Sequence, residues 1–109
     1  MDRRIELAIS EIESDLARAW DVVQLAALVH LSPSRFRHLF KEETGVSIGQ
    51  HLRERRLERA ELLLRTTFLS IKKVSLEVGL SSTSRFVQYF KQKHRMTPTA
   101  YRKHFSRFR

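Results

Sequence analysis

The chain has 109 residues, 41% of them hydrophobic, which is enough for one domain or two very small ones with a modest core. Its formal net charge of +9 favours an anionic partner, either nucleic acid or an acidic surface. The sequence contains no Cys, which excludes disulfides and thiolate metal sites, and no apolar run approaches the roughly 20 residues of a membrane span. Because no apolar segment follows Met1-Asp2-Arg3-Arg4, we expect no secretory signal, no membrane partner and a cytoplasmic location.

The positive charge is concentrated in the later part of the chain. Residues 1–30 contain three Lys or Arg and six Asp or Glu. Residues 31–109 contain 18 Lys or Arg and six Asp or Glu. From Ser82 to the C-terminus there are eight basic residues and no acid. We therefore expect the anion-binding face to be built by everything after the first two helices.

Helical periodicity predicts an all-α fold of about seven helices. The first is expected from about Arg3 to Arg18, capped by Asp2. Its apolar face holds Ile5, Ile9, Ile12 and Leu16. Asp21 begins the second helix, whose apolar face holds Val22, Leu25, Ala26 and Val29. The third helix is capped by Ser32, starts at Pro33 and ends at Gly45.

Ser47 and Gln50 form a capping-box pattern that opens the longest helix, from about Ile48 to Arg65. The fifth helix is capped by Ser70 and ended by Gly79. The sixth, from about Thr83 to His94, is opened by Ser81 or Ser82, and the last by Thr97-Pro98. We divide the chain into an N-terminal helix-turn-helix subdomain (1–46), a linker helix (47–66) and a C-terminal helix-turn-helix subdomain (67–109).

One motif occurs twice with identical spacing. Ser34-Arg35-Phe36 precedes Phe40-Lys41, and Ser84-Arg85-Phe86 precedes Phe90-Lys91. In each copy a short helix and a tight turn come first, which is the pattern of a helix-turn-helix. The second helix of that motif normally enters the major groove of DNA. The repeat therefore predicts two recognition helices in one chain.

A helical wheel separates the two faces of each recognition helix. The inward positions are Phe36, Leu39, Phe40, Phe86, Tyr89 and Phe90, whose spacing favours a core over a stacking platform for single strands. The outward or flanking side chains can pair with base edges. Base contacts are expected from Ser34, Arg35, Arg37 and His38 in the first helix and from Thr83, Ser84, Arg85 and Gln88 in the second. Phosphate contacts are expected from Lys41, Lys91, Arg95 and Arg102.

The connecting helix offers a test of length. About eighteen residues at ~1.5 Å each span ~27 Å, and successive major grooves on one face of DNA lie ~34 Å apart. A helix of this length can hold two recognition helices roughly one turn apart. The site would be asymmetric because the two helices carry different outward side chains.

The chain resembles the DNA-binding domain of the AraC/XylS family of bacterial transcription regulators. The resemblance covers about Asp21 to Phe105. The segments that carry it are Leu25-Ala26, Leu31-Ser32-Pro33-Ser34-Arg35-Phe36, Leu39-Phe40-Lys41, Gly45-Val46-Ser47, Arg56-Leu57, Glu77-Val78-Gly79, Phe90-Lys91, Thr97-Pro98 and Ala100-Tyr101-Arg102. It implies seven helices in two subdomains, one recognition helix from each in adjacent major grooves of promoter DNA, and activation by contact with RNA polymerase. The family's base-contacting positions fall on the same eight residues.

The departures from the family pattern lead to three further expectations. Arg95 stands where Gly is usual, at a cost of roughly 1 kcal/mol for a left-handed residue, so this helix end is expected to be rebuilt. Ser75 replaces the usual Ala and Leu80 the usual Phe, which predicts looser packing and less base specificity in the second subdomain. His51 replaces the usual Tyr and is expected to be a partly buried packing residue.

Competing interpretations concern enzymes and protein partners. The five His residues show no metal-ligand spacing, and Glu54, Glu58 and Glu61 lie among arginines as an expected solvated, ion-paired face. We therefore expect no enzymatic activity, metal or cofactor. The alternative is a basic helical module that binds an acidic protein.

Many family members carry a further ligand-binding or dimerisation domain, so the chain is either a stand-alone regulator or, slightly favoured, a fragment of a longer one. We expect a monomeric domain within a full-length protein that can dimerise.

Overall fold

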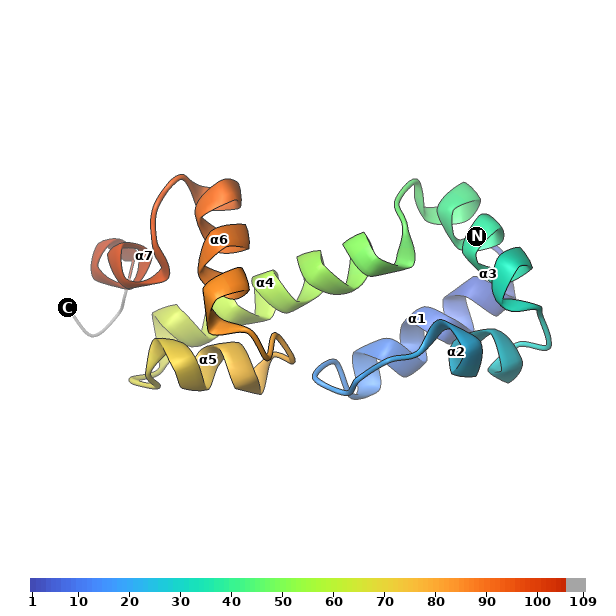
Figure 1. Cartoon of the computed structure of the whole chain (residues 1–109), viewed down its shortest axis with the longest axis horizontal. Helices are drawn as coiled ribbons and strands as arrows, with labels where there is room; N and C mark the ends of the chain where they lie inside the picture. Colours follow the sequence, from blue (N-terminus) through green and yellow to red (C-terminus); the bar gives the residue numbers. More distant parts are fainter. Residues whose placement is uncertain (106–109) are drawn as a thin grey trace. The chain divides into compact units, whose positions relative to one another are not determined.

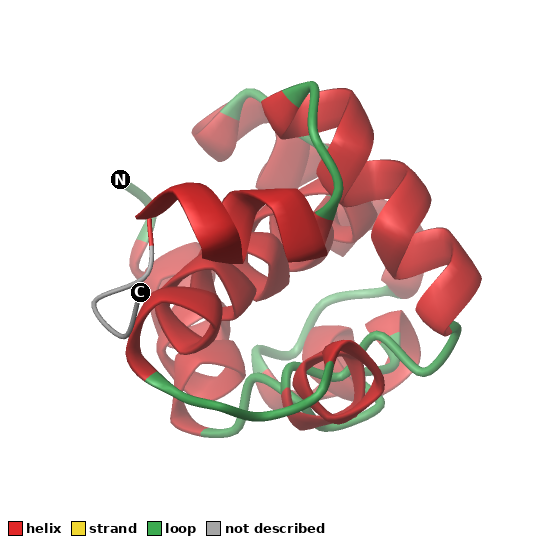
Figure 2. Cartoon of the chain, turned by 90° about the vertical axis from the view of Figure 1, so that its left-hand side faces the viewer, coloured by secondary structure: helices red, strands yellow, loops and turns green. Residues whose placement is uncertain are grey.

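The computed structural model describes residues 1–105, which form seven helices and no strand (Figures 1 and 2). The predicted all-α fold class is confirmed. The helices are α1 (Arg3–Ser14), α2 (Val22–Leu28), α3 (Pro33–Thr44), α4 (Ile48–Thr66), α5 (Ile71–Glu77), α6 (Thr83–His94) and α7 (Pro98–Phe105). The predicted C-terminal subdomain extends to residue 109, so its last residues lie outside the described range. None of the helices described is both long and apolar enough to cross a membrane.

The chain divides into two compact units, Met1–Glu54 and the part from Arg55 onward. The predicted linker segment 47–66 coincides closely with α4, but both units draw core residues from this helix. Ile48 and Leu52 pack into the first core, and Leu57 and Leu64 are buried in the second. The helix is therefore part of both hydrophobic cores, because its apolar residues complete each of them.

The core of the first unit is formed by α1, α2, α3 and the start of α4. It consists of Ile5, Ala8, Ile12, Leu16, Leu25, Ala26, Val29, Phe36, Leu39, Phe40 and Ile48. The prediction that α1 continues to Arg18 is wrong, since the helix ends at Ser14. Asp15 leaves the helical conformation (φ −155°, ψ 72°), and its carbonyl accepts a hydrogen bond from Nε1 of Trp20 at 2.9 Å. Leu16 is nevertheless buried in this core, as its apolar spacing predicted, although it lies beyond the end of the helix.

The helix starts follow the local capping signals. Asp2, Asp21, Ser32 and Ser70 cap helices as predicted, and of the two serines expected to open α6, Ser82 is the cap. In each case the side-chain oxygen accepts a hydrogen bond from a backbone N–H of the first turn, as that of an N-cap does. The Ser47 hydroxyl likewise accepts from the N–H of Gln50 at 3.1 Å, at the start of α4.

The ends of α3 and α6 have the same geometry although their terminating residues differ. Gly45 (φ 82°) and Arg95 (φ 58°) are both left-handed, and each donates its N–H to a lysine carbonyl one turn back at 2.8 Å. The acceptors are Lys41 and Lys91. The expectation that Arg95 rebuilds the helix end is therefore wrong: the chain keeps the left-handed turn and places an arginine in it.

The core of the second unit is formed by α5, α6, α7 and the later part of α4. It consists of Leu57, Ala60, Leu64, Val74, Val78, Phe86, Phe90 and Tyr101. Ser75 is fully buried, and its hydroxyl donates a hydrogen bond to the Leu80 carbonyl. The hydroxyl thus joins α5 to the turn that leads into α6, and the looser packing expected of this unit stays a prediction.

Candidate nucleic-acid interface

The two recognition helices, α3 and α6, rest on the same aromatic scaffold. Phe36 and Phe40 are inaccessible to solvent, with ring centroids 5.9 Å apart, and Phe86 and Phe90 repeat the arrangement at 5.8 Å. Tyr89 is only half-buried. Since the four Phe rings lie inside the two cores, they position the recognition helices and are not available for stacking on bases.

The turns ahead of α3 and α6 are closed in the same way. The N–H of Leu31 donates to the Ala26 carbonyl, and the N–H of Leu80 donates to the Ser75 carbonyl, both at 2.9 Å. The residue before each leucine is left-handed, His30 (φ 60°) in the first turn and Gly79 (φ 88°) in the second. The helix-turn-helix geometry predicted from the repeat is thus present twice.

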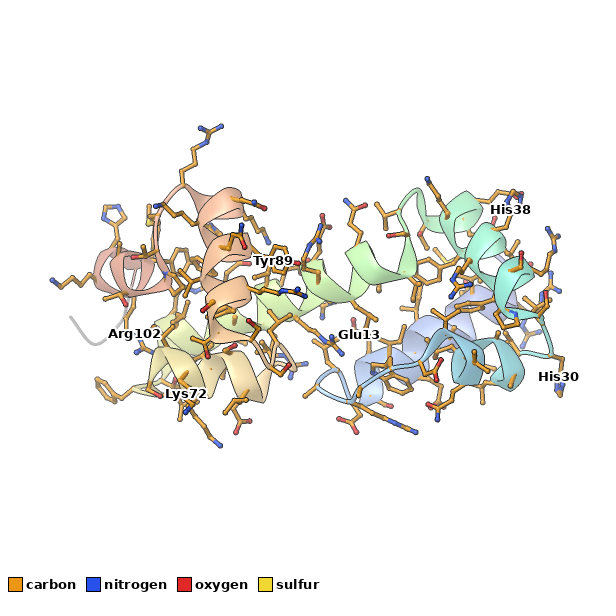
Figure 3. The ribbon with its side chains drawn as sticks, in the orientation of Figure 1. Glu13, His30, His38, Lys72, Tyr89 and Arg102 are labelled. Atoms are coloured by element: carbon orange, nitrogen blue, oxygen red, sulfur yellow. The ribbon has the colours of Figure 1, made fainter. Side chains whose placement is uncertain are left out.

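The outward face of α3 carries a cluster of exposed polar and basic groups. All four predicted base-contacting residues of this helix are exposed, and so is the predicted phosphate contact Lys41. They are Ser34, Arg35, Arg37 and His38. Figure 3 shows the His38 side chain on the outer side of α3. This face can present guanidinium, imidazole, hydroxyl and ammonium groups to a DNA groove.

The outward face of α6 is less basic. Ser84, Arg85, Gln88 and Lys91 are exposed, while Thr83 is half-buried. Val87 occupies the place that Arg37 has in α3 and is itself half-buried against the core. The two recognition helices therefore share their buried scaffold and differ in the chemistry of their outward faces.

The two remaining predicted phosphate contacts are placed differently. Arg95 is exposed at the end of α6. Arg102, labelled in Figure 3, is half-buried, and its Nε donates to the Leu64 carbonyl at 3.2 Å. Part of its guanidinium is thus used to hold α7 against α4. The assignment of Arg102 to a phosphate stays a prediction, as do the other assigned contacts.

The arrangement of acidic groups was only partly predicted. Arg55 pairs with Glu58 at 2.9 Å on α4, as expected for an ion-paired face. Glu61 instead reaches α6, where its carboxylate lies 2.9 Å from Nζ of Lys93 and 3.4 Å from Nε2 of His94. The sequence could not show this pairing, because it joins residues 32 positions apart.

Two further polar residues, His51 and Glu42, have contacts that bear on the predictions. His51 is half-buried with its ring edge-on to Phe40, centroids 5.3 Å apart, which confirms its packing role. Glu42, which we did not assign to the interface, lies beside His38 on the face of α3. The spacing of four residues between His38 and Glu42 was the signal in the sequence that could have indicated this contact.

Among residues 1–105 no group of three or more His, Asp or Glu side chains could hold a metal ion.

Comparison with known proteins identifies the family. The family described as a helix-turn-helix domain matches residues 25–104 of this chain. The arabinose operon regulatory protein of Escherichia coli is 35% identical over 103 residues, covering 94% of this chain and 35% of that protein. The chain belongs to the AraC/XylS family of transcription regulators.

Solved structures of AraC-type domains have the same fold. The DNA-binding domain of AdpA, a global transcriptional factor solved in complex with a target DNA, aligns with a TM-score of 0.88 at 26% identity, covering 94% of this chain and 92% of that one. An AraC-type regulator from Chromobacterium violaceum aligns with a TM-score of 0.86 at 27% identity, covering 96% and 94%. This chain spans about a third of the length of the curated relatives it matches. It is an AraC-type DNA-binding domain.

Proposed function

We propose that this domain activates bacterial transcription by placing α3 and α6 in successive major grooves of one asymmetric promoter site. The observation that carries the proposal is the repeated buried scaffold beneath two exposed faces of different chemistry. Two helices docked in the same way will read different half-sites if their outward side chains differ. Arg37 and His38 of α3 correspond to Val87 and Gln88 of α6.

The length of α4 is compatible with this arrangement. Its 19 residues correspond to about 28 Å of helix, and the major groove returns to the same face of DNA after ~34 Å. The base contacts in this proposal are Ser34, Arg35, Arg37 and His38 of α3, and Thr83, Ser84, Arg85 and Gln88 of α6. Lys41, Lys91, Arg95 and Arg102 contact phosphates and contribute affinity without specificity.

The proposal extends to the partners and the setting of the domain. We infer that the domain binds DNA as a monomer in the cytoplasm, catalyses no reaction, and acts on RNA polymerase bound beside its site. Dimerisation would belong to a longer protein, since the curated relatives are about three times as long as this chain.

Selection of bound duplexes from a random pool, followed by sequencing, tests the proposal. We expect binding to any duplex that weakens steeply with salt, and one preferred sequence made of two different half-sites about one helical turn apart. A pool without any enriched sequence would refute the regulator proposal. The alternative, a basic module for an acidic protein, predicts that outcome together with salt-sensitive binding to polyanions of any kind.

A further inference from the structure

A carboxylate lies among the residues that we assign to DNA. Oε2 of Glu42 is 3.3 Å from Nε2 of His38, one helical turn earlier on α3. Both side chains are more than half exposed, at 59% and 69%. Together with Arg37 and Lys41 they line an open hollow on the outward face of the helix. A negative charge weakens binding to phosphates, so Glu42 must act on this face in a different way from the basic residues around it.

The contact bears on which nitrogen of His38 carries a proton. A neutral imidazole has one nitrogen that donates and one that accepts, and the partner of one nitrogen decides the role of the other. A carboxylate only accepts. Glu42 beside Nε2 therefore favours the form in which Nε2 carries the proton and Nδ1 keeps a free lone pair.

We propose that Glu42 is a positioning residue that holds the proton of His38 on Nε2, so that Nδ1 accepts a hydrogen bond from an amino group in the major groove. Adenine N6 and cytosine N4 present such amino groups, whereas guanine and thymine present acceptor oxygens at the corresponding edge. His38 then selects adenine or cytosine on the contacted strand. This inference rests on the proposed DNA-binding function and adds which bases one position of α3 reads.

The second recognition helix lacks this arrangement. Gln88 and Gln92 stand at the places in α6 that His38 and Glu42 have in α3. A Gln amide carries a donor and an acceptor at once, so neither residue is held in one role by the other. A Glu42→Gln substitution is therefore a conservative test in α3, because it removes the charge and keeps the size and exposure of the side chain.

The first experiment compares base preferences. Duplex selection is carried out with the unmodified chain, His38→Ala, Glu42→Gln and the double variant, and the position whose preference is lost in His38→Ala is taken as the one read by His38. We expect adenine or cytosine there for the unmodified chain. In Glu42→Gln the preference over guanine should fall by about fivefold or more. When His38 is already replaced by Ala, Glu42→Gln should cause no further change in the base preference at this position.

Glu77→Gln is the matched control. Glu77 forms an exposed ion pair with Lys73 at the same spacing of four residues, on α5. This variant changes the net charge equally and should leave the base preference unchanged. Three results would overturn the inference: a preference for guanine at the His38 position, an unchanged preference in Glu42→Gln, or an equal effect of Glu42→Gln when His38 is absent, since the carboxylate would then act directly.

The second experiment needs no DNA and separates this inference from the proposed function. Nitrogen NMR of the imidazole at about pH 8, where an ordinary imidazole is neutral, reports which ring nitrogen carries the proton. We expect more of the Nε2-protonated form of His38 in the unmodified chain and in Glu77→Gln than in Glu42→Gln. Equal populations would refute the role of Glu42 even if a preferred DNA site is found. A pool without an enriched sequence would instead refute the regulator proposal and with it the base assignment.

Discussion

Replacement of Arg95 by Gly should stabilise the fold and weaken DNA binding at the same time. Arg95 ends α6 with φ 58° and ψ 24°. A left-handed conformation costs a residue with a Cβ atom roughly 1–2 kcal/mol. Gly removes that cost but also gives the unfolded chain more freedom, worth about 0.4–1 kcal/mol in the opposite direction. The net expectation is a gain of about 0.5–1 kcal/mol, or a rise in Tm of roughly 2–8 °C for a domain of this size.

The same substitution removes a cation that we assign to a phosphate. The slope of log K against log salt for duplex binding should become shallower by about one unit. Stability would be measured by urea denaturation followed by circular dichroism, and binding by titration of a duplex at several salt concentrations. Arg95→Lys is the matched control, because it keeps both the Cβ atom and the charge and should leave stability and slope unchanged.

Gly45 provides the reverse test at the equivalent position of α3. A Cβ atom built on Gly45 meets nothing within 4 Å, so Gly45→Ala changes only the backbone preference at φ +82°. We expect a loss of about 0.5–1 kcal/mol. If Arg95→Gly unfolds more easily than the unmodified chain, the conformational reasoning is refuted. An unchanged salt slope would separately refute the phosphate contact of Arg95.

Three further substitutions test the interface, the second core and the N-terminal cap. Arg37→Ala should cost ~1–3 kcal/mol on the preferred duplex and little in folding stability; an equal loss on random duplex would show that Arg37 contacts phosphate alone. Ser75→Ala should lower the free energy of unfolding by about 1 kcal/mol, because the Leu80 carbonyl loses its buried donor; unchanged urea denaturation would contradict this. The Arg4 guanidinium, by hydrogen bonding, lowers the pKa of Asp2 from 3.8 to about 2. The stabilising effect of this pair is therefore complete above pH 3.8 and is lost as the pH falls toward 2. Carboxyl NMR should show the Asp2 midpoint rising part of the way toward 3.8 in Arg4→Gln, which keeps the backbone N–H of residue 4, and a midpoint that stays near 2 would rule out the Arg4 guanidinium as the cause.

Local signals in the sequence were sufficient to place most helix boundaries. Ser32 caps α3 and Gly45 ends it, as predicted, and Ser82, one of the two predicted candidates, caps α6. Each of these signals acts through hydrogen bonds within one turn, so it can be read without knowledge of the rest of the chain. The inward spacing of Phe36 and Phe86 was readable for the same reason, because helical periodicity decides which face can be buried.

Features that depend on the turns between helices could not be read in this way. α1 ends at Ser14, where Asp15 leaves the helical conformation and its carbonyl accepts a hydrogen bond from Nε1 of Trp20. The hydroxyl of Ser75 donates a hydrogen bond to the Leu80 carbonyl in the turn between α5 and α6, a contact that the replacement of the usual Ala by Ser did not by itself reveal.

The sequence by itself determined the all-α class, the repeated helix-turn-helix and most of the residues on each outward face, since these follow from periodicity and capping within single helices. Only the tertiary structure decided that α4 completes both cores, that Glu61 pairs with Lys93, and that Arg95 keeps a left-handed helix end. The physical reason is that these outcomes depend on which surfaces the packed cores bring together. At Arg95 the left-handed helix end is kept, closed by a hydrogen bond to the Lys91 carbonyl, although this conformation costs a residue with a Cβ atom roughly 1–2 kcal/mol.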